Sequence, residues 1–233
     1  MISFHGVRST AVGVFVEKYP PRPVPAQRVE RFTVPGRSGD VLAFEGAYDN
    51  TRQAYDIYVS AEGPGLPLIA AQAARWLLVP GYQELEDEYD RDTFRLAAYL
   101  GPVDLENTLN QFGRARIEFD CCPQRYLKSG AQALTIESGD ELANPTGFEA
   151  LPLITVHGSG AGTLTVGETV LTLTDCDDLF IDCREHECYK LASESNFNST
   201  VSGGWPVLGT GNTAISWAGG ITGVTIIPRW YWL

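Results

Sequence analysis

The sequence has no long apolar run and few cysteines, and each absence excludes a class of protein. Its apolar stretches are far shorter than the roughly 18 residues that a membrane-spanning helix needs. Met1–Gly6 show no basic stretch followed by an apolar region, so no secretory signal is visible. Five cysteines in 233 residues are an odd and sparse set, which argues against a disulfide framework and for a reducing compartment. We expect a soluble protein with no membrane insertion.

Basic residues are scarce, and most of them lie in the first half of the chain. The sequence has 17 Lys and Arg against 29 Asp and Glu, a formal net charge of −12. Residues 1–130 hold 14 basic and 17 acidic residues, whereas residues 131–233 hold 3 and 12. Binding DNA through its phosphates depends on clustered Lys and Arg, so the chain is not expected to hold DNA in that way. An acidic surface that only maintains solubility is the plain alternative.

Patterns that mark active sites are also missing. No glycine pattern joins a strand to a helix as a phosphate-binding loop requires, and no Ser or Cys has the context of an activated nucleophile. His5, His157 and His186 are scattered. The acidic run 84–92 could supply a carboxylate pair for acid–base chemistry, but adjacent acids are more typical of a solvated loop. We predict no catalytic residue and no enzymatic activity.

Three cysteines lie close enough together to raise the question of a metal site. Cys176, Cys183 and Cys188 are separated by six and four residues, with His186 between the last two. Zinc sites usually combine two short Cys-x₂₋₄-Cys pairs, and no second pair is present here. Thiols on either side of a turn at residues 184–187 are the better interpretation, and the pair 121–122 is interpreted as a strand end. We predict no metal and no cofactor.

Alternating apolar and polar residues predict a mainly β protein. One helix is predicted near residues 67–78, with Pro67 in its first turn and Pro80-Gly81 after its end. Residues 93–100 fit a second, weaker helix or a strand. Gly167-Glu168 predicts a tight hairpin turn. Strand-like runs are Val12–Val16, Arg31–Val34, Ala54–Val59, Arg114–Phe119, Leu151–Val156, Gly162–Val166, Thr169–Leu173 and Leu179–Asp182.

Two segments rich in chain breakers interrupt these runs. Lys18–Pro25 contains four prolines, so it is expected to be an extended arm or a solvated connector rather than an interior strand. Leu127–Asn144 contains Gly and Asn-Pro breakers and is expected to separate two domains, residues 1–130 and 131–233. The predicted fold therefore has two β-sandwich-type domains, the first with one or two helices.

Seven segments, taken in order, carry a resemblance to a known family. Together they resemble a siphophage distal tail protein, the hub of the tail tip or baseplate. Each segment is short, but their order and spacing extend along nearly the whole chain. The segments are Ile2–Ser9, Val34–Leu42, Ala74–Leu77, Ile117–Pro123, Asn144–Gly158, Leu208–Asn212 and Ile226–Trp230.

The resemblance implies an architectural role. It implies an N-terminal domain that forms a homo-hexameric ring and a C-terminal galectin-like sandwich. The ring would join the tail tube protein to tail-tip or baseplate proteins, and DNA would pass through its channel without specific binding. The protein would belong to the virion, at the tail tip, after assembly in the cytoplasm of the bacterial host. His157 is followed by Gly158-Ser159-Gly160, which departs from the His-x-Asn-Pro-Arg pattern of sugar-binding galectins.

Candidate residues follow for the ring. Arginine is favoured at interfaces, so the predicted ring interface combines the proline segment with three arginines: Pro21, Pro23, Arg8, Arg31 and Arg37. Six copies of a −12 chain would carry a formal charge of −72, which repels DNA rather than capturing it. Acids predicted to face the channel or a ring neighbour are Glu84, Glu86, Asp87 and Glu88.

One alternative function comes from the aromatic residues of the second half. Aromatic rings on a β-sandwich can stack on sugar rings, so a carbohydrate-binding, lectin-like module that recognises host surface glycans is the competing prediction. Such rings are also common in cores and interfaces. The aromatic residues in question are Phe197, Trp205, Trp217, Trp230, Tyr231 and Trp232.

Overall fold

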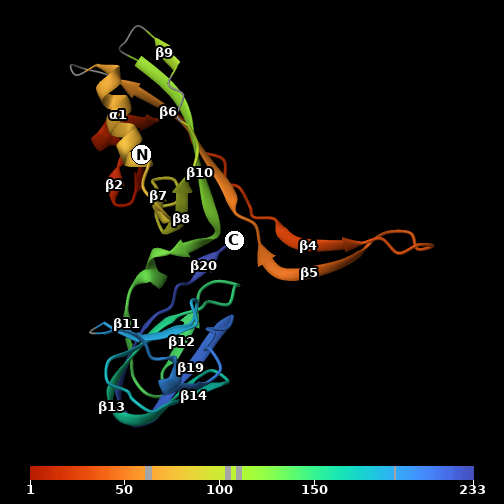
Figure 1. Ribbon diagram of the computed structural model, residues 1–233, viewed down its shortest axis with the longest axis vertical. Coiled ribbons are helices and arrows are strands. Elements are labelled where there is room, and N and C mark those ends of the chain that lie inside the picture. The colour runs from red at the N-terminus through yellow and green to blue at the C-terminus, as the bar shows by residue number, and fades with distance from the viewer. Residues whose placement is uncertain (61–64, 103–105, 109–111, 192) are drawn as a thin grey trace. The chain divides into compact units, whose positions relative to one another are not determined.

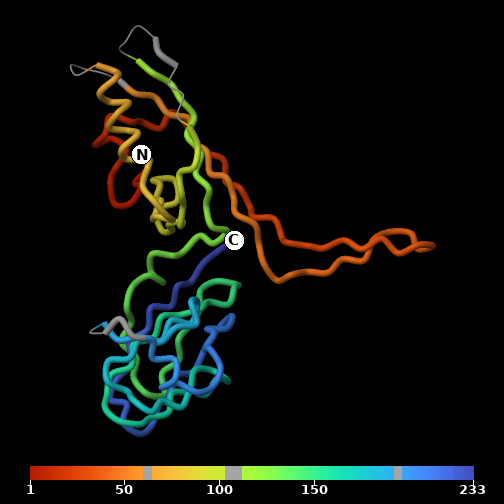
Figure 2. The backbone as a smooth tube through the Cα atoms, viewed as in Figure 1, coloured from red at the N-terminus to blue at the C-terminus, as the bar shows by residue number. Residues whose placement is uncertain are grey.

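The protein is mainly antiparallel β-structure with one α-helix among the residues described (Figures 1 and 2). The structure is a computed structural model that describes residues 1–60, 65–102, 106–108, 112–191 and 193–233. The chain divides into two compact units, Met1–Arg125 with Leu233, and Tyr126–Trp232. We call them unit 1 and unit 2. The division falls a few residues before the expected boundary at residue 130.

Unit 1 is organised around one antiparallel sheet with the order β2-β1-β7-β8-β10-β6-β3. Its strongest pairing joins β6 to β10, in continuous register from Thr51 opposite Cys121 to Ser60 opposite Phe112. The strands are β1 (Ile2–Phe4), β2 (Val7–Arg8), β3 (Val14–Val16), β6 (Thr51–Ser60), β7 (Gln83–Asp87), β8 (Thr93–Tyr99), β9 (Glu106–Thr108) and β10 (Phe112–Leu127).

The predicted helix is present as α1 (Leu66–Leu77), after the 3₁₀ turn η1 (Ser9–Val12) and strand β6. Pro67 occupies the first turn, where the missing amide proton costs nothing. The Trp76 side chain is buried, and its indole N–H donates to the Val7 carbonyl at 3.1 Å. The helix therefore packs one apolar face against the sheet. The buried residues on that face are Leu66, Ile69, Ala73, Trp76 and Leu77.

The sequence of residues 93–100 fits either a helix or a strand, and pairing with a neighbouring strand makes the segment a strand. Residues 93–99 form strand β8, which pairs with β7 through Gln83 opposite Ala97 and Leu85 opposite Arg95. The pairing buries Ala97 completely. Cys121 and Cys122 were expected at a strand end, but they lie inside the long strand β10. That expectation was wrong because β10 continues past Pro123 to Leu127.

A separate two-stranded sheet lies between β3 and β6 in the sequence. Its strands are β4 (Gln27–Phe32) and β5 (Val41–Tyr48), and neither pairs with the main sheet of unit 1. Figure 1 shows the two strands running out beyond the body of unit 1 as a long hairpin. We call residues 27–48 the arm.

Unit 2 is built on two long strands, β13 (Leu153–Val166) and β19 (Gly211–Ile227), which pair along most of their length. The first half of β13 also pairs with β15 and the second half with β14, so β13 contributes to two layers. The other elements are η2 (Lys128–Ala131), β11 (Leu134–Ile136), β12 (Glu141–Asn144), β14 (Thr169–Leu173), β15 (Leu179–Asp182), β16 (Glu187–Lys190), β17 (Ser193–Asn196), η3 (Asn198–Thr200), β18 (Val201–Gly203) and β20 (Tyr231–Trp232).

Glycines permit the bend between the two layers. The β13–β19 register shifts around Gly158, and a Cβ placed on Gly220 would lie only 1.9 Å from the Ser159 carbonyl oxygen. Two separate strands were expected at 151–156 and 162–166, but they form one bent strand. The hairpin turn predicted at Gly167-Glu168 is confirmed, and Gly167 has a positive φ of 58°.

A partly buried ion pair fixes the end of β15 to the segment after β19. The Arg229 guanidinium donates two hydrogen bonds to the Asp182 carboxylate, at 2.7 and 2.8 Å. Asp182 also accepts backbone N–H bonds from Arg184 and Glu185. Burial alone would raise the Asp182 pKa, but these hydrogen bonds and the Arg229 charge outweigh it and hold the pKa below its usual value.

Four of the five cysteines are buried in the core, and Cys122 is half-buried. Burial raises the pKa of Cys183 to about 12 and that of Cys188 to about 11, so neither is a ready thiolate. Both flank the β15–β16 turn, as the sequence predicted. All five cysteines are free thiols.

Candidate assembly surface

The arm exposes apolar side chains on both of its faces. Phe32 is 50% exposed, Leu42 47% and Phe44 63%. Directly opposed residues of an antiparallel pair share a face, so Phe32 and Val41 lie on one face while Phe44 and Val29 lie on the other. A two-stranded hairpin alone is marginally stable in water, and clustered exposed apolar residues mark interaction sites. The arm is therefore the best candidate in unit 1 for contact with another protein.

The tip of the arm is an ordered turn. The Thr33 hydroxyl donates to the Asp40 carboxylate at 3.0 Å, and the Arg37 N–H donates to the Val34 carbonyl at 3.1 Å. Gly36 and Gly39 have positive φ values of 82° and 84°, which glycine adopts without strain. The turn presents Arg37 at the far end of the arm. Two predicted interface residues, Arg37 at the tip and Arg31 on β4, thus lie on this one element.

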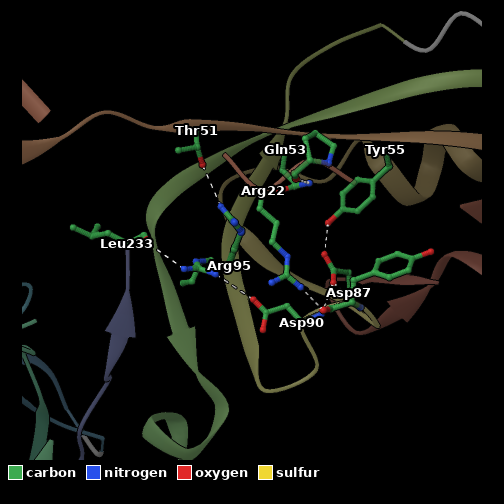
Figure 3. A network of polar contacts seen from close by, with 11 residues as sticks. Arg22, Thr51, Gln53, Tyr55, Asp87, Asp90, Arg95 and Leu233 are labelled. Atoms are coloured by element: carbon green, nitrogen blue, oxygen red, sulfur yellow. Dashed lines mark hydrogen bonds and ion pairs between the residues drawn. The ribbon is translucent and has the colours of Figure 1, made fainter. Parts of the chain in front are cut away.

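The proline segment, residues 18–25, fixes the base of the arm to the main sheet of unit 1 (Figure 3). The Gln53 amide donates to the Pro21 carbonyl at 2.9 Å, and the Arg22 guanidinium donates to the Tyr89 carbonyl at 2.6 Å. The Tyr19 ring lies 4.3 Å from the Tyr89 ring, centroid to centroid. The segment is therefore a fixed connector, and the element that extends outward is the hairpin that follows it.

Three further contacts close the base of the arm. The Arg28 guanidinium lies 2.8 Å from the Asp49 carboxylate, across the two ends of the hairpin. The Asn50 amide donates to Asp120 on β10 at 2.6 Å, and the Tyr82 hydroxyl donates to the same carboxylate at 3.0 Å. These bonds tie the chain to the sheet where the arm ends.

The acidic run is the end of β7 and the turn into β8, and several of its acids have partners within unit 1. Asp87 accepts a hydrogen bond from the Tyr55 hydroxyl at 3.0 Å and also from the N–H groups of Tyr89 and Asp90 (Figure 3). Burial, followed by the Asp87 charge, raises the Tyr55 pKa well above its ordinary value. Glu88 lies 2.9 Å from the Met1 amine. Asp87 and Glu88 thus have structural roles.

Arg125 and Arg95 complete this polar cluster. Arg125 lies 3.4 Å from the Asp90 carboxylate and donates to the Leu233 main-chain oxygen at 3.0 Å (Figure 3). Arg95 donates to the Thr51 hydroxyl at 3.3 Å, and burial lowers its pKa. A hollow whose lining includes Arg22, Asp87 and Arg95 has room for only about 20 Å³, roughly one water molecule. Such a hollow holds no substrate, which fits a cluster that fixes the structure.

The remaining predicted residues are placed differently. Arg8 ends β2, where it stands opposite Ser3, and it is not on the arm. Pro23 is half-buried in the connector. Glu84 is exposed on β7, whereas Glu86 is half-buried and has a partner. The structure therefore gathers only part of the predicted set in one place.

Sequence reasoning missed the apolar residues that define the arm. The glycine-rich turn at 36–40 between two strand-like runs was the available signal for a hairpin. Exposure of the apolar side chains had no such signal, because the same alternation is typical of strands that pack on a core. The residues concerned are Phe32, Val34, Val41, Leu42 and Phe44.

Two general features can be stated for the described part of the chain. No helix in it has the length and hydrophobicity needed to cross a bilayer. Within the same residues, no group of three or more His, Cys, Asp and Glu side chains is placed to hold a metal ion.

Solved structures decide the fold. The Dit protein of phage SPP1, described as a paradigm of the hub adsorption apparatus in phages that infect Gram-positive bacteria, superimposes with a TM-score of 0.74. The match covers 100% of this chain and 98% of that chain at 14% identity. The chain has the Dit fold. A chain from the baseplate of phage p2 in its activated conformation matches with a TM-score of 0.52 and 10% identity, over 92% and 89% of the two chains.

The sequence alone does not reach these proteins. No family model and no curated protein matches it. The likeness to the Dit fold is therefore carried by the arrangement of strands. The two solved structures are described as part of a phage hub adsorption apparatus and of a phage baseplate. The mainly β fold expected from the sequence is confirmed.

Proposed function

We propose that this protein is a structural hub component of a phage tail tip, and that six copies form a ring through the arm. The observation that carries the proposal is the exposure of apolar side chains on both faces of the arm. The Dit fold over the whole chain supports it. In a ring, a patch on each copy docks on a different patch of the next copy. The arm supplies the first patch, and a second copy of this chain is its partner.

The two arginines of the arm add directional polar contacts to its apolar area. Arg31 lies beside Leu42 on one face, and Arg37 stands at the tip. Arginine forms several fixed hydrogen bonds and is enriched at interfaces. We propose that these two residues hydrogen-bond to the acidic surface of a neighbouring copy, while Phe32 and Phe44 supply the apolar contact. The other three predicted interface residues lie off the arm. Pro21 and Pro23 would act by positioning the base of the arm, and Arg8 would act at a separate contact.

The ring would connect the tail tube protein to tail-tip or baseplate proteins and leave a channel for DNA. Residues 1–130 carry 14 basic and 17 acidic residues, so a wall built from them is close to neutral. A wall of that kind lets DNA pass without holding its phosphates. Glu84 and Glu86 remain candidates for the channel or for a ring neighbour. The chemistry is architectural, and the protein would act in the virion after assembly in the host cytoplasm.

Native mass spectrometry tests the proposal. Six copies of the 25.4 kDa chain have a mass of about 152 kDa. A dominant species at that mass, with a single symmetric peak in sedimentation, is the expected result. A chain that stays monomeric at every concentration, alone and with its tail-tube partner, contradicts the ring.

A further inference from the structure

Unit 2 has a hollow of about 350 Å³ on the outer face of one sheet layer. Thr155 of β13 stands opposite Phe180 of β15, and Phe180 stands opposite Tyr189 of β16. Directly opposed residues share a face, so these three side chains form a row. The neighbouring positions Ile181 and Cys188 are fully buried on the opposite, core-facing side. The hollow is lined by Thr155, His157, Asp177, Asp178, Phe180 and Lys190, and we call it the Phe180 pocket.

An aromatic ring is fixed at the floor of the pocket. The Phe180 and Tyr189 rings are stacked, with centroids 5.2 Å apart and planes 9° from parallel. The stack covers one face of Phe180 and holds the ring in place. A ring fixed in this way offers its remaining surface to a flat apolar partner at little cost in side-chain entropy.

The polar groups around the ring are also held in place. His157 Nδ1 lies 2.7 Å from an Asp178 carboxylate oxygen, and its Nε2 lies 3.3 Å from the Thr225 hydroxyl. Asp178 has a positive φ of 44°, a conformation that is uncommon outside glycine. Backbone strain of this kind often marks a binding site. Gly223 stands opposite His157, and a Cβ there would meet nothing within 4 Å, so the space beside the imidazole is open.

Lys190 provides a fixed donor at the other side of the pocket. Its ammonium donates to Asp175 at 2.8 Å and to Asp177 at 3.3 Å. It also lies 5.6 Å from the centroid of the Phe197 ring. The Lys190 side chain is only 16% exposed. Donors and acceptors thus line the pocket together with an aromatic ring.

We propose that the Phe180 pocket binds a neutral saccharide. Its size falls in the range of roughly 300–1,000 Å³ that is usual for small-ligand sites. A sugar has a face of C–H groups for the Phe180 ring and hydroxyls that both donate and accept for Asp177, His157 and Lys190. The Lys190 ammonium is already paired with Asp175 and Asp177, and Asp178 adds a third carboxylate beside His157, so an anionic ligand is repelled. This site is independent of the ring that unit 1 is proposed to form.

The test uses the full-length chain on an array of neutral hexose and N-acetylhexosamine oligosaccharides, with phosphorylated and sialylated glycans on the same surface. Neutral glycans are expected to bind. The variants F180L and K190M are each expected to weaken that binding about tenfold or more. The control W232L changes another partly exposed aromatic residue of unit 2 and is expected to bind as the unchanged protein does.

Thermal unfolding of each variant shows whether it is folded. The variant H157A changes a half-exposed side chain, so it keeps the test valid if F180L fails to fold. Three results overturn the proposal. They are a failure of every neutral glycan to bind the unchanged protein, binding that survives F180L, K190M and H157A alike, and binding of anionic glycans alone. None of these results affects the mass of the ring, so the two proposals are tested separately.

Discussion

The arm gives the sharpest prediction, because its phenylalanines should matter for assembly and not for folding. In the variant F32S/F44S, two exposed rings are replaced by a small polar side chain. Phe44 is 63% exposed and Phe32 50%, so neither ring contributes much to the core of unit 1. Surface substitutions of this kind usually change the free energy of unfolding by less than about 0.5 kcal/mol.

The loss expected at the ring interface is much larger. A phenylalanine buries about 200 Å² when it is fully enclosed. With Phe44 63% exposed, about 125 Å² is still open to burial by a neighbour. At about 25 cal/mol per Å² this amounts to about 3 kcal/mol, and the same reasoning gives about 2.5 kcal/mol for Phe32. Ordering of the arm reduces these upper values, but a loss of at least about a hundredfold in association remains.

The assay is native mass spectrometry over a dilution series, with circular dichroism as a check on folding. F32S/F44S should stay folded and shift from about 152 kDa toward the 25.4 kDa monomer. F112S is the matched control, since Phe112 is 55% exposed on β10 and not on the arm. A double variant that assembles as tightly as F112S would refute the role of the arm.

Three further predictions concern unit 2. G220A should lower the free energy of unfolding by about 1–3 kcal/mol in urea melts, because the new Cβ would lie 1.9 Å from the Ser159 carbonyl oxygen. The control G223A should lower the free energy of unfolding by less than about 1 kcal/mol, because a Cβ at that position meets nothing within 4 Å. D182N should cost about 2 kcal/mol by leaving the half-buried Arg229 without its charged partner; the same melts check this, and a cost below that of G223A would contradict it. The folded-state Asp182 pKa lies below its usual value, so its stabilisation is complete above about pH 4 and is lost as the pH falls through that pKa. Melts between neutral pH and about pH 3 should show an acid loss that is smaller in D182N, and equal losses in the two proteins would count against the ion pair.

Local signals were enough to predict several elements. Pro67 and Pro80-Gly81 bound a helix with one apolar face, and Gly167 marks a hairpin turn, so both elements follow from short-range chemistry. The buried thiols at Cys183 and Cys188 also follow, because their spacing fits a turn better than a zinc site. Each of these features depends on residues near one another in the sequence.

Features that depend on distant residues were not predictable in the same way. Residues 93–99 have a local pattern that also suits a helix, and only the pairing with β7 makes them a strand. Asp182 and Arg229 lie 47 residues apart and meet only when β13 has bent and β19 has returned beside it. The apolar side chains of the arm are exposed because β4 and β5 pair only with each other among the described strands. The local sequence of the arm does not indicate that no further strand will pair with them.

Electron microscopy of the purified chain, with class averages viewed along the symmetry axis, tests directly whether the arm builds the ring. Closed rings of six copies are expected, in which density for the arm reaches from each copy onto the next. F32S/F44S should give no such rings, while F112S should give them in full. Rings that close without any contact from residues 27–48, or particles that never exceed the size of one chain, would contradict this role of the arm.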